Sequence, residues 1–287
     1  VVHTVAELRS LVAAARARGE TVGLVPTMGA LHEGHASLVD ASAAECDLTI
    51  VTIFVNPTQF APHEDFGKYP RTLDADMRLV GARGAGVVFA PSVDEVYPPG
   101  NATFVEMHGV AEPLEGAFRP THFRGVATVV LKLFNMVGAD VAYFGRKDYQ
   151  QTLVVKQLVR DFNLPIAIRV CPTVREPDGL ALSSRNAYLS ADERRRALVL
   201  SRALRTVEGL VATGERDVGA LTDALRRTLA EEPEVRVQYA VIVDGETLAE
   251  TPLVDRPCAA LIAAQVGTTR LIDNVLLADE GRRGVKE

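Results

Sequence analysis

The segment TVGLVPTMGALHEGH, residues 21–35, carries the clearest indication of the fold. Residues 21–25 form a short apolar run that ends at Pro26, as expected of a buried strand, and residues 36–45 have the composition of a helix. A strand, a glycine-bearing loop and a helix in that order place backbone N–H groups beside the positive end of a helix dipole. Gly29 and Gly34 allow the backbone to approach a ligand closely. The stretch therefore predicts an anion site at a helix entrance.

Two imidazoles, His32 and His35, stand three residues apart at this entrance. The glycine spacing resembles a Walker A loop, but His35 and Ala36 occupy the places of its lysine and its Ser/Thr, which excludes a P-loop. An imidazole can donate a hydrogen bond to a phosphate oxygen and, when protonated, adds charge near neutral pH. The pattern H-E-x-H is one residue shorter than a zincin motif. Phosphate binding is favoured over a metal site or a structural role for the pair.

The first part of the chain alternates strand-like and helix-like segments. Strands are expected at residues 48–55, 86–90, 141–144 and 166–170. Helices are expected at residues 1–20, 74–83, 126–137 and 148–162. Because repeated β-loop-α units of this size build parallel sheets, we expect an α/β domain over residues 1–173, with helices on both faces of its sheet.

The pattern changes after residue 173. Ser190 and Glu193 form a capping box that opens a long helix, and a second helix is expected at residues 218–230. Three β-like runs follow, at residues 235–243, 259–266 and 269–275. Two helices followed by strands predict a smaller C-terminal α+β domain over residues 174–287, ending in a solvated tail at 279–287.

Composition excludes several classes of partner. The 287 residues carry 31 Lys and Arg against 37 Asp and Glu, a net charge of −6, with no basic stretch that could follow a nucleic acid backbone. No apolar run is long enough to span a bilayer, and the N-terminus lacks the apolar core of a signal peptide. Cys46, Cys171 and Cys258 are odd in number and widely separated, as expected of reduced thiols. We therefore expect a cytoplasmic protein that binds neither nucleic acid nor membrane.

Two amide side chains, Asn56 and Gln59, follow the strand expected at 48–55. In an open parallel sheet, ligands bind beyond the carboxyl ends of the strands. Amides both donate and accept, which suits a substrate with hydroxyl and carboxylate groups. The alternative for Asn56 is a turn, because Asn-Pro commonly initiates one.

A second polar segment, GRKDYQQ at residues 145–151, follows the strand expected at 141–144 and opens a helix. Lys147 is a flexible cation beside a helix N-terminus, a suitable partner for nucleotide phosphates. Asp148 could cap that helix and also accept from a ribose hydroxyl. The alternative is a solvated charge cluster.

Three further segments carry candidate residues. Ser183, Ser184 and Arg185 offer two hydroxyls and a guanidinium for a triphosphate, or they belong to a loop before a capped helix. Asp74 and Asp76 could hold a cation, although acidic residues in a first helical turn usually complement the dipole. His122 and Arg124, in the segment THFRG at 121–125, are either structural or at the border of the substrate pocket.

These segments resemble a known family. HEGH at residues 32–35 resembles the His-x-Gly-His signature of the nucleotidyltransferase superfamily, and PTMGALHEGH at 26–35 resembles the pantothenate synthetase family. Residues 52–60 are similar to the family's pantoate-binding segment. Residues 145–151 resemble its Gly-Glu-Lys-Asp-x-Gln-Gln, with Arg146 in place of the glutamate. Residues 178–186 resemble its version of the Lys-Met-Ser-Lys-Ser loop, and residues 267–274 extend the resemblance into the C-terminal part.

The resemblance implies a Rossmann-like N-terminal domain that binds ATP and pantoate, a smaller C-terminal domain that acts as a lid, and a homodimer. It implies ATP-dependent condensation of (R)-pantoate with β-alanine to pantothenate, AMP and diphosphate, through a pantoyl adenylate and with Mg²⁺ mainly on the ATP phosphates. ATP-binding residues are then Met28, Gly29, His32, Gly34, His35, Gly145, Lys147, Asp148, Val174, Ser183, Ser184 and Arg185. The substrates pantoate and β-alanine take Met28, Asn56, Gln59 and Gln151. Catalysis falls to His32, His35, Lys147 and Arg185, and Asp74 and Asp76 are candidate metal ligands.

Two other functions stay open. An adenylyltransferase of the same superfamily would keep the adenylyl group on a phosphorylated acceptor and would have no use for the amides Gln59 and Gln151. A non-catalytic nucleotide-binding module would bind ATP without releasing pyrophosphate.

Overall fold

The computed structural model describes residues 1–61 and 65–277, so the tail expected at residues 279–287 lies outside the described residues. The chain divides into two compact units, Val1–Val174 and Arg175–Glu287. Within the described ranges, no helix combines the length and the apolar character needed to cross a membrane.

The first unit contains a five-stranded sheet with the strand order β3-β2-β1-β4-β5. Its strands are β1 (Val22–Thr27), β2 (Leu48–Ile53), β3 (Val87–Phe89), β4 (Val141–Gly145) and β5 (Ala167–Cys171). Every neighbouring pair is parallel. The predicted parallel α/β sheet is confirmed.

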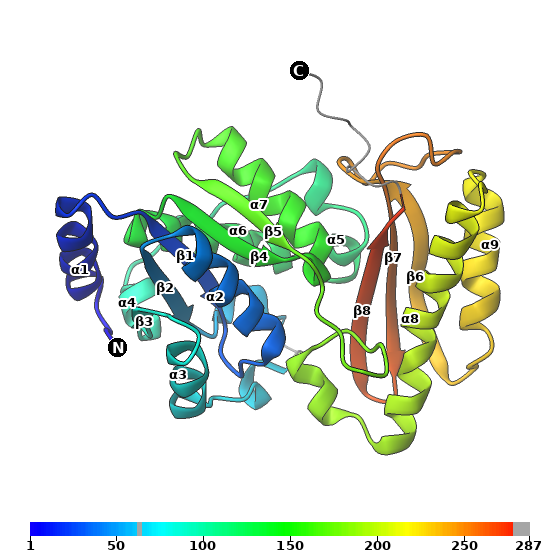
Figure 1. Ribbon diagram of the computed structural model, residues 1–287, viewed down its shortest axis with the longest axis horizontal. Coiled ribbons are helices and arrows are strands. Elements are labelled where there is room, and N and C mark those ends of the chain that lie inside the picture. Colours follow the sequence, from blue (N-terminus) through cyan, green and yellow to red (C-terminus); the bar gives the residue numbers. More distant parts are fainter. Residues whose placement is uncertain (62–64, 278–287) are drawn as a thin grey trace. The chain divides into compact units, whose positions relative to one another are not determined.

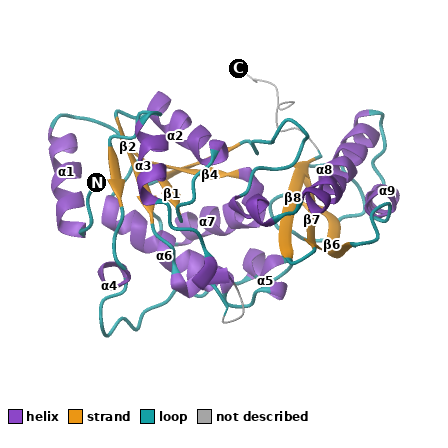
Figure 2. Cartoon of the chain, turned by 90° about the horizontal axis from the view of Figure 1, so that it is seen from below, coloured by secondary structure: helices purple, strands orange, loops and turns teal. Residues whose placement is uncertain are grey.

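Helices cover both faces of this sheet (Figures 1 and 2). They are α1 (Val5–Ala17), α2 (Glu33–Glu45), α3 (Leu73–Gly81), α6 (His122–Val137) and α7 (Tyr149–Asp161), with the short helices α4 (Val93–Val96) and α5 (Glu115–Phe118). Successive strand residues point to opposite faces. Leu24 and Ile50 therefore join the core formed with α1, α6 and α7, while Val25 and Val51 join the core formed with α2 and α3.

Pro26 lies inside β1, although the apolar run was expected to end there. The ladder between β1 and β2 continues to Thr27, whereas the ladder between β1 and β4 covers only Gly23 and Leu24. The carbonyl of Val22 accepts from Asp140 N at 2.8 Å, so alternation turns the backbone groups of Pro26 toward the β4 side as well. A proline has no N–H to donate there. Pro26 is tolerated in this central strand because β1 no longer pairs with β4 beyond Leu24.

The second unit is a three-stranded antiparallel sheet with two helices packed against it (Figure 1). Its elements are α8 (Ala191–Ala212), α9 (Val218–Leu229), β6 (Val235–Asp244), β7 (Cys258–Val266) and β8 (Thr269–Leu276). The capping box of Ser190 and Glu193 is present at the start of α8. The predicted α+β architecture of this part is confirmed.

Candidate active site

The strand order of the sheet reverses between β1 and β4. From β1 the chain proceeds to β2 and β3 on one side, while β4 and β5 lie on the other, so the order reverses between β1 and β4. Open parallel sheets bind their ligands beyond the carboxyl ends of the strands at such a reversal. The loop at residues 28–32 follows β1, and the segment at 146–151 follows β4. The fold therefore brings both predicted nucleotide segments to one end of the sheet.

The backbone of the first loop is bound by a buried carboxylate. Asp76, in the first turns of α3, is 2% exposed, and its two oxygens accept from Ala30 N at 3.0 Å and Leu31 N at 2.9 Å. The hydroxyl of Thr72 donates to the same carboxylate at 3.1 Å. Ala30 has a φ of 50°, in the region that only glycine adopts without strain, so these bonds hold a conformation of some energetic cost. Asp76 is the anchor of the loop.

Other N–H groups of the loop are also used internally. Gly34 N donates to His32 Nδ1 at 3.1 Å, and His32 N donates to His35 Nδ1 at 3.4 Å. Together with the two bonds to Asp76, four backbone N–H groups have acceptors within the protein. These four N–H groups are therefore used within the protein, and the anion site expected at the helix entrance stays a prediction. The imidazoles of His32 and His35 are the side-chain candidates of this loop for a phosphate.

The hydrogen bonds also define the tautomers of both histidines. Each Nδ1 accepts an N–H, so it carries no proton and the neutral ring is protonated on Nε2. The two rings are 4.2 Å apart between centroids. Burial, followed by the charges of His32 and Lys147, lowers the pKa of His35 to about 3. His35 is thus a neutral Nε2–H donor at physiological pH, and Lys147 from the other loop acts on it electrostatically.

The candidate metal residues differ in their surroundings. Asp74 is exposed, whereas Asp76 is buried and accepts three hydrogen bonds from the protein. No group of three His, Cys, Asp or Glu that could hold a metal ion occurs within residues 1–61 and 65–277. The assignment of Asp74 and Asp76 to a metal stays a prediction.

The two amides after β2 have different surroundings. Asn56 is 1% exposed and is the N-cap of the short 3₁₀ helix η1 (Pro57–Gln59). Its Nδ2 donates to Gln59 Oε1 and to Gly125 O, both at 3.1 Å, and its Oδ1 accepts from Tyr97 Oη at 2.9 Å. Gln59 Nε2 lies 2.9 Å from Met28 Sδ. The structure therefore brings Met28 and Gln59 together, and Asn56 holds Gln59 in place.

The start of α6 supports the same glutamine. His122 Nδ1 is 3.0 Å from Gln59 O, and a Cβ on Gly125 would come within 2.4 Å of Thr58 O. Arg124 instead pairs with Glu106 at 3.2 Å, and both side chains are largely exposed. These contacts place His122 beside the backbone of Gln59, and its role, structural or at the border of the substrate pocket, stays a prediction. The sequence THFRG shows a glycine at position 125, but the reason for it, the close packing of α6 against η1, is visible only in the structure.

Positions 145–151 include the end of β4 at Gly145, the 3₁₀ helix η4 (Arg146–Asp148) and the start of α7. Asp148 is exposed and is the N-cap of α7, but its side chain makes no capping hydrogen bond. Gln150 is buried, accepts from Glu115 N at 3.0 Å and donates to Val110 O and Pro113 O. Gln151 is partly exposed. The structure thus separates a structural glutamine from the one predicted to bind substrate.

The remaining predicted residues lie elsewhere along the chain. Val174 ends the first unit and is partly buried. Ser183 caps the 3₁₀ helix η5 (Ser184–Tyr188) of the second unit by accepting from Arg185 N at 3.2 Å. Ser183, Ser184 and Arg185 are all partly exposed. They form a compact hydroxyl-and-guanidinium loop on the second unit.

A family model for pantoate-beta-alanine ligase matches residues 1–276. The chain belongs to this family. A pantothenate synthetase from Acidobacterium capsulatum is 55% identical over 288 residues, covering 96% of each chain. One from Moorella thermoacetica is 53% identical over 277 residues, covering 96% of this chain and 98% of the relative.

Solved structures agree with this membership. Pantothenate synthetase from Thermus thermophilus has 45% identity and a TM-score of 0.91, over 96% of this chain and 98% of its own. The pantoate-beta-alanine ligase of Francisella tularensis, solved with beta-gamma ATP and beta-alanine, has 36% identity and a TM-score of 0.79, over 96% and 97%. As a pantoate-beta-alanine ligase family member, the chain is a ligase that forms an amide bond.

Proposed function

We propose that this protein condenses (R)-pantoate with β-alanine at the expense of ATP, giving pantothenate, AMP and diphosphate through a pantoyl adenylate. The observation that supports this most is the pair of imidazoles His32 and His35, whose Nδ1 atoms accept backbone N–H groups, at the same end of the sheet as Lys147 and the Met28–Gln59 pair. Phosphate donors and amide donors at one end of a sheet suit a reaction between a nucleotide and an acid.

Adenylation solves a leaving-group problem. A carboxylate does not acylate an amine directly, because hydroxide leaves poorly, whereas AMP leaves readily. In the first step the pantoate carboxylate attacks the α-phosphorus, and negative charge develops on the phosphoryl oxygens and the departing diphosphate. His32 and His35 donate through Nε2–H and Lys147 adds a full positive charge, so the groups that stabilise this charge are in place before reaction. Ser183, Ser184 and Arg185 supply further donors to the phosphates.

We assign the selection of pantoate to the amide side chains of Gln59 and Gln151. Gln59 and Gln151 offer donors and acceptors for the hydroxyl and carboxylate groups, and Met28 contributes an apolar side chain beside Gln59. Asn56 acts through Gln59, since its side-chain groups are occupied by Gln59, Gly125 and Tyr97. Substitution of Asn56 is therefore expected to act through the placement of Gln59.

In the second step the β-alanine amine attacks the acyl adenylate. An alkyl ammonium of pKa about 10 is neutral in only roughly one part in a thousand at pH 7, so the site has to favour the neutral amine. His35 is a poor base for this, because its Nδ1 accepts a backbone N–H and its pKa is lowered to about 3. His35 serves as a hydrogen-bond donor in both steps.

Magnesium fits this site as part of the nucleotide substrate. Mg²⁺ binds oxygen ligands and is commonly held by substrate phosphates, several waters and one or two carboxylates. The carboxylate oxygens of Asp76 already accept backbone N–H groups, and the described residues offer no cluster of three ligands. MgATP is therefore written as the substrate, and no protein cage is assigned to the ion.

We also propose a cytoplasmic homodimer, as the family resemblance implies. The free cysteines Cys46 and Cys258 are buried thiols, which suits a reducing compartment. Sedimentation equilibrium of the purified chain tests the dimer, and a mass of one chain at micromolar concentration would contradict it.

Isotope transfer tests the reaction. The protein is incubated with MgATP, β-alanine and pantoate labelled with ¹⁸O in its carboxylate, and one labelled oxygen is expected in the AMP released, because the carboxylate oxygen becomes the bridge to phosphorus. An adenylyltransferase would release no AMP, and a binding module would release no pyrophosphate. Unlabelled AMP, or pyrophosphate release that needs no pantoate, would refute the proposal.

A matched pair of variants tests the site. Gln59→Leu is expected to raise the KM for pantoate about tenfold or more while the KM for ATP changes little, because a hydrogen bond to a charged substrate is lost. Gln157→Leu is the control, since Gln157 lies on α7 with an exposed contact to Asp161. Equal effects of the two substitutions would remove Gln59 from the pantoate site.

A further inference from the structure

A tight turn precedes the Ser183–Arg185 loop in the second unit. Glu176 N donates to Leu180 O and Gly179 N donates to Glu176 O, both at 2.8 Å. Gly179 has a φ of 96°, which a side chain would disfavour. An isolated bridge joins Arg175 to Ala181. The turn therefore presents the Glu176 side chain from a defined piece of backbone.

Asn186 joins this turn to η5. Its Nδ2 donates to Glu176 Oε1 and to Ala181 O, both at 3.0 Å. Two acceptors at the same nitrogen leave one possible orientation of the amide, because a flipped amide would point its oxygen at both of them. Asn186 N also donates to Ser183 O at 2.9 Å. The loop that carries the two serines and Arg185 is thus tied to Glu176.

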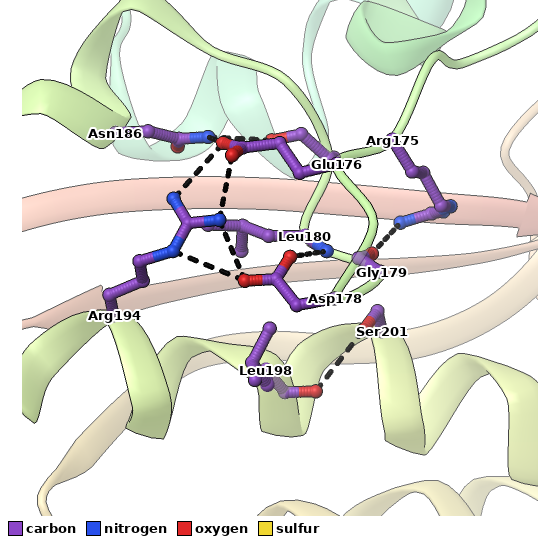
Figure 3. A network of polar contacts seen from close by, with 10 residues as sticks. Arg175, Glu176, Asp178, Gly179, Leu180, Asn186, Arg194, Leu198 and Ser201 are labelled. Atoms are coloured by element: carbon purple, nitrogen blue, oxygen red, sulfur yellow. Dashed lines mark hydrogen bonds and ion pairs between the residues drawn. The ribbon is translucent and has the colours of Figure 1, made fainter. Parts of the chain in front are cut away.

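One guanidinium from α8 binds both carboxylates of the turn. Arg194 Nη1 and Nη2 donate to Glu176 Oε1 and Oε2 at 3.0 and 2.7 Å, and its Nε and Nη2 donate to Asp178 Oδ2 at 3.1 and 2.7 Å (Figure 3). The three side chains are a quarter to a third exposed. The hydrogen bond from Arg194 is also the main cause of the lowered pKa of Glu176. A fork of this kind fixes direction as well as distance.

We propose that Arg194 is a positioning residue that fixes the Ser183–Arg185 loop before ATP binds, acting through Glu176 and Asn186. The inference rests on the proposed function, in which this loop contacts the ATP phosphates. A ligand that meets a loop already in its binding shape does not have to order it, so pre-organisation appears as affinity. Arg194 itself touches no substrate in this scheme.

The same helix provides a matched control. Arg202 also lies on α8 and pairs with a carboxylate, Glu231, at 2.8 Å, but both members of this pair are more exposed and neither contacts the turn. Arg194→Gln and Arg202→Gln therefore remove the same chemical group and one kind of interaction from one helix. Arg194 is connected to the Ser183–Arg185 loop through Glu176 and Asn186, whereas Arg202 pairs with Glu231.

Three measurements are made on both variants: the KM for ATP and for pantoate, hydrogen exchange of the loop amides without ligand, and Tm. Arg194→Gln is expected to raise the KM for ATP roughly tenfold to a hundredfold, the range for losing hydrogen bonds between charged groups, with little change in the KM for pantoate. Exchange of the Arg185 and Asn186 amides, which donate to Ser183, should accelerate about tenfold or more. Arg202→Gln should match the wild type in its KM values and in the exchange of the loop amides.

A lower Tm with an ATP KM within about twofold of the Arg202→Gln value would make Arg194 merely structural and overturn the proposal. Unchanged exchange of the loop amides would overturn it as well. Arg194→Lys keeps the charge without the fork and should give intermediate values. If Arg194→Gln does not fold, Glu176→Gln, which keeps the size and an acceptor for Asn186, takes its place with a smaller effect in the same direction.

The exchange measurement uses no substrate, so it separates the two levels of inference. Loop loosening in an Arg194 variant of a protein that makes no pantothenate would refute the proposed function and leave the positioning intact. An active wild type whose Arg194 variant matches the Arg202 variant would refute the positioning alone.

Discussion

Protonation of His35 gives the most demanding prediction. Burial and the neighbouring positive groups lower its pKa to about 3. At pH 5 an ordinary histidine of pKa 6.5 is about 97% protonated, whereas His35 should be only about 1% protonated. The ring should therefore remain a neutral Nε2–H donor throughout the pH range in which the enzyme is assayed.

Because the pKa of His35 differs between the folded and the unfolded chain, the free energy of unfolding depends on pH. Below pH 6.5 the unfolded chain takes up a proton on residue 35, while the folded chain does not until the pH approaches 3. The unfolded state thus binds more protons in this window, and the free energy of unfolding decreases as the pH falls. From pH 6.5 to pH 5 the loss is about 1.5 pH units at about 1.4 kcal/mol each, or about 2 kcal/mol.

His35→Gln removes this contribution. Urea unfolding of wild type and variant at about pH 7.5 and about pH 5 should show that the variant loses about 2 kcal/mol less between the two conditions. The histidines that do not interact with residue 35, such as His3 and His108, contribute equally to both proteins and cancel in the difference. His108→Gln is the control for removing an imidazole, because that side chain is 78% exposed.

Nitrogen NMR of ¹⁵N-histidine-labelled protein tests the same statement directly. The resonance pair absent from His35→Gln should show an unprotonated Nδ1 and a protonated Nε2, with no titration between about pH 5 and about pH 8. A midpoint near 6.5, or a proton on Nδ1, would refute both the tautomer and the donor role assigned to His35.

Three substitutions test the supports of the site and of α8. Asp76→Asn places an N–H₂ where a backbone N–H needs an acceptor, so we expect a loss of roughly 1–3 kcal/mol in urea unfolding and at least about a tenfold loss of kcat/KM; unchanged values of both would contradict the anchor. Gly125→Ala pushes on the backbone beside Gln59, so the KM for pantoate should rise more than the KM for ATP, and the opposite order in steady-state kinetics would contradict this. Gly267→Ala would displace the capping side chain Glu193, which should lower the free energy of unfolding by about 1 kcal/mol with activity in the cold unchanged; a stable variant with lost activity would speak against it.

The architecture could be predicted because it depends on local patterns. Short apolar runs bounded by turn residues indicated every strand to within about two residues, and the helix expected at residues 36–45 is α2. The errors fall where tertiary contacts decide. The helix expected to begin at 126 begins at His122, because a polar start is buried against η1. The short helices α4 and α5 carry no periodicity long enough to be noticed.

The site shows the same division. The histidines, the lysine and Gln59 were predicted from their positions after strands, since chain order fixes which end of a parallel sheet they reach, whereas Gln151 was assigned through the family resemblance. Their partners could not be found that way. Asp76 binds residues 45 and 46 positions away in sequence, and a first-turn carboxylate is ordinarily explained by the dipole alone. Gln150 and Gln151 differ only in which of them meets the backbone at residues 110–115, a contact invisible in the sequence.

Pro26 has a consequence for engineering this enzyme. Any other residue there would add an N–H facing the β4 side, and that donor would need an acceptor in the space between the two strands. A β1–β4 ladder extended past Leu24 could supply that acceptor, and it would join the two strands at the end of the sheet where we propose that the substrates bind. Because its nitrogen cannot donate a hydrogen bond, Pro26 disfavours pairing between β1 and β4 at this end of the sheet. Libraries built to widen substrate range should leave this position unvaried, even though its side chain need never meet a ligand.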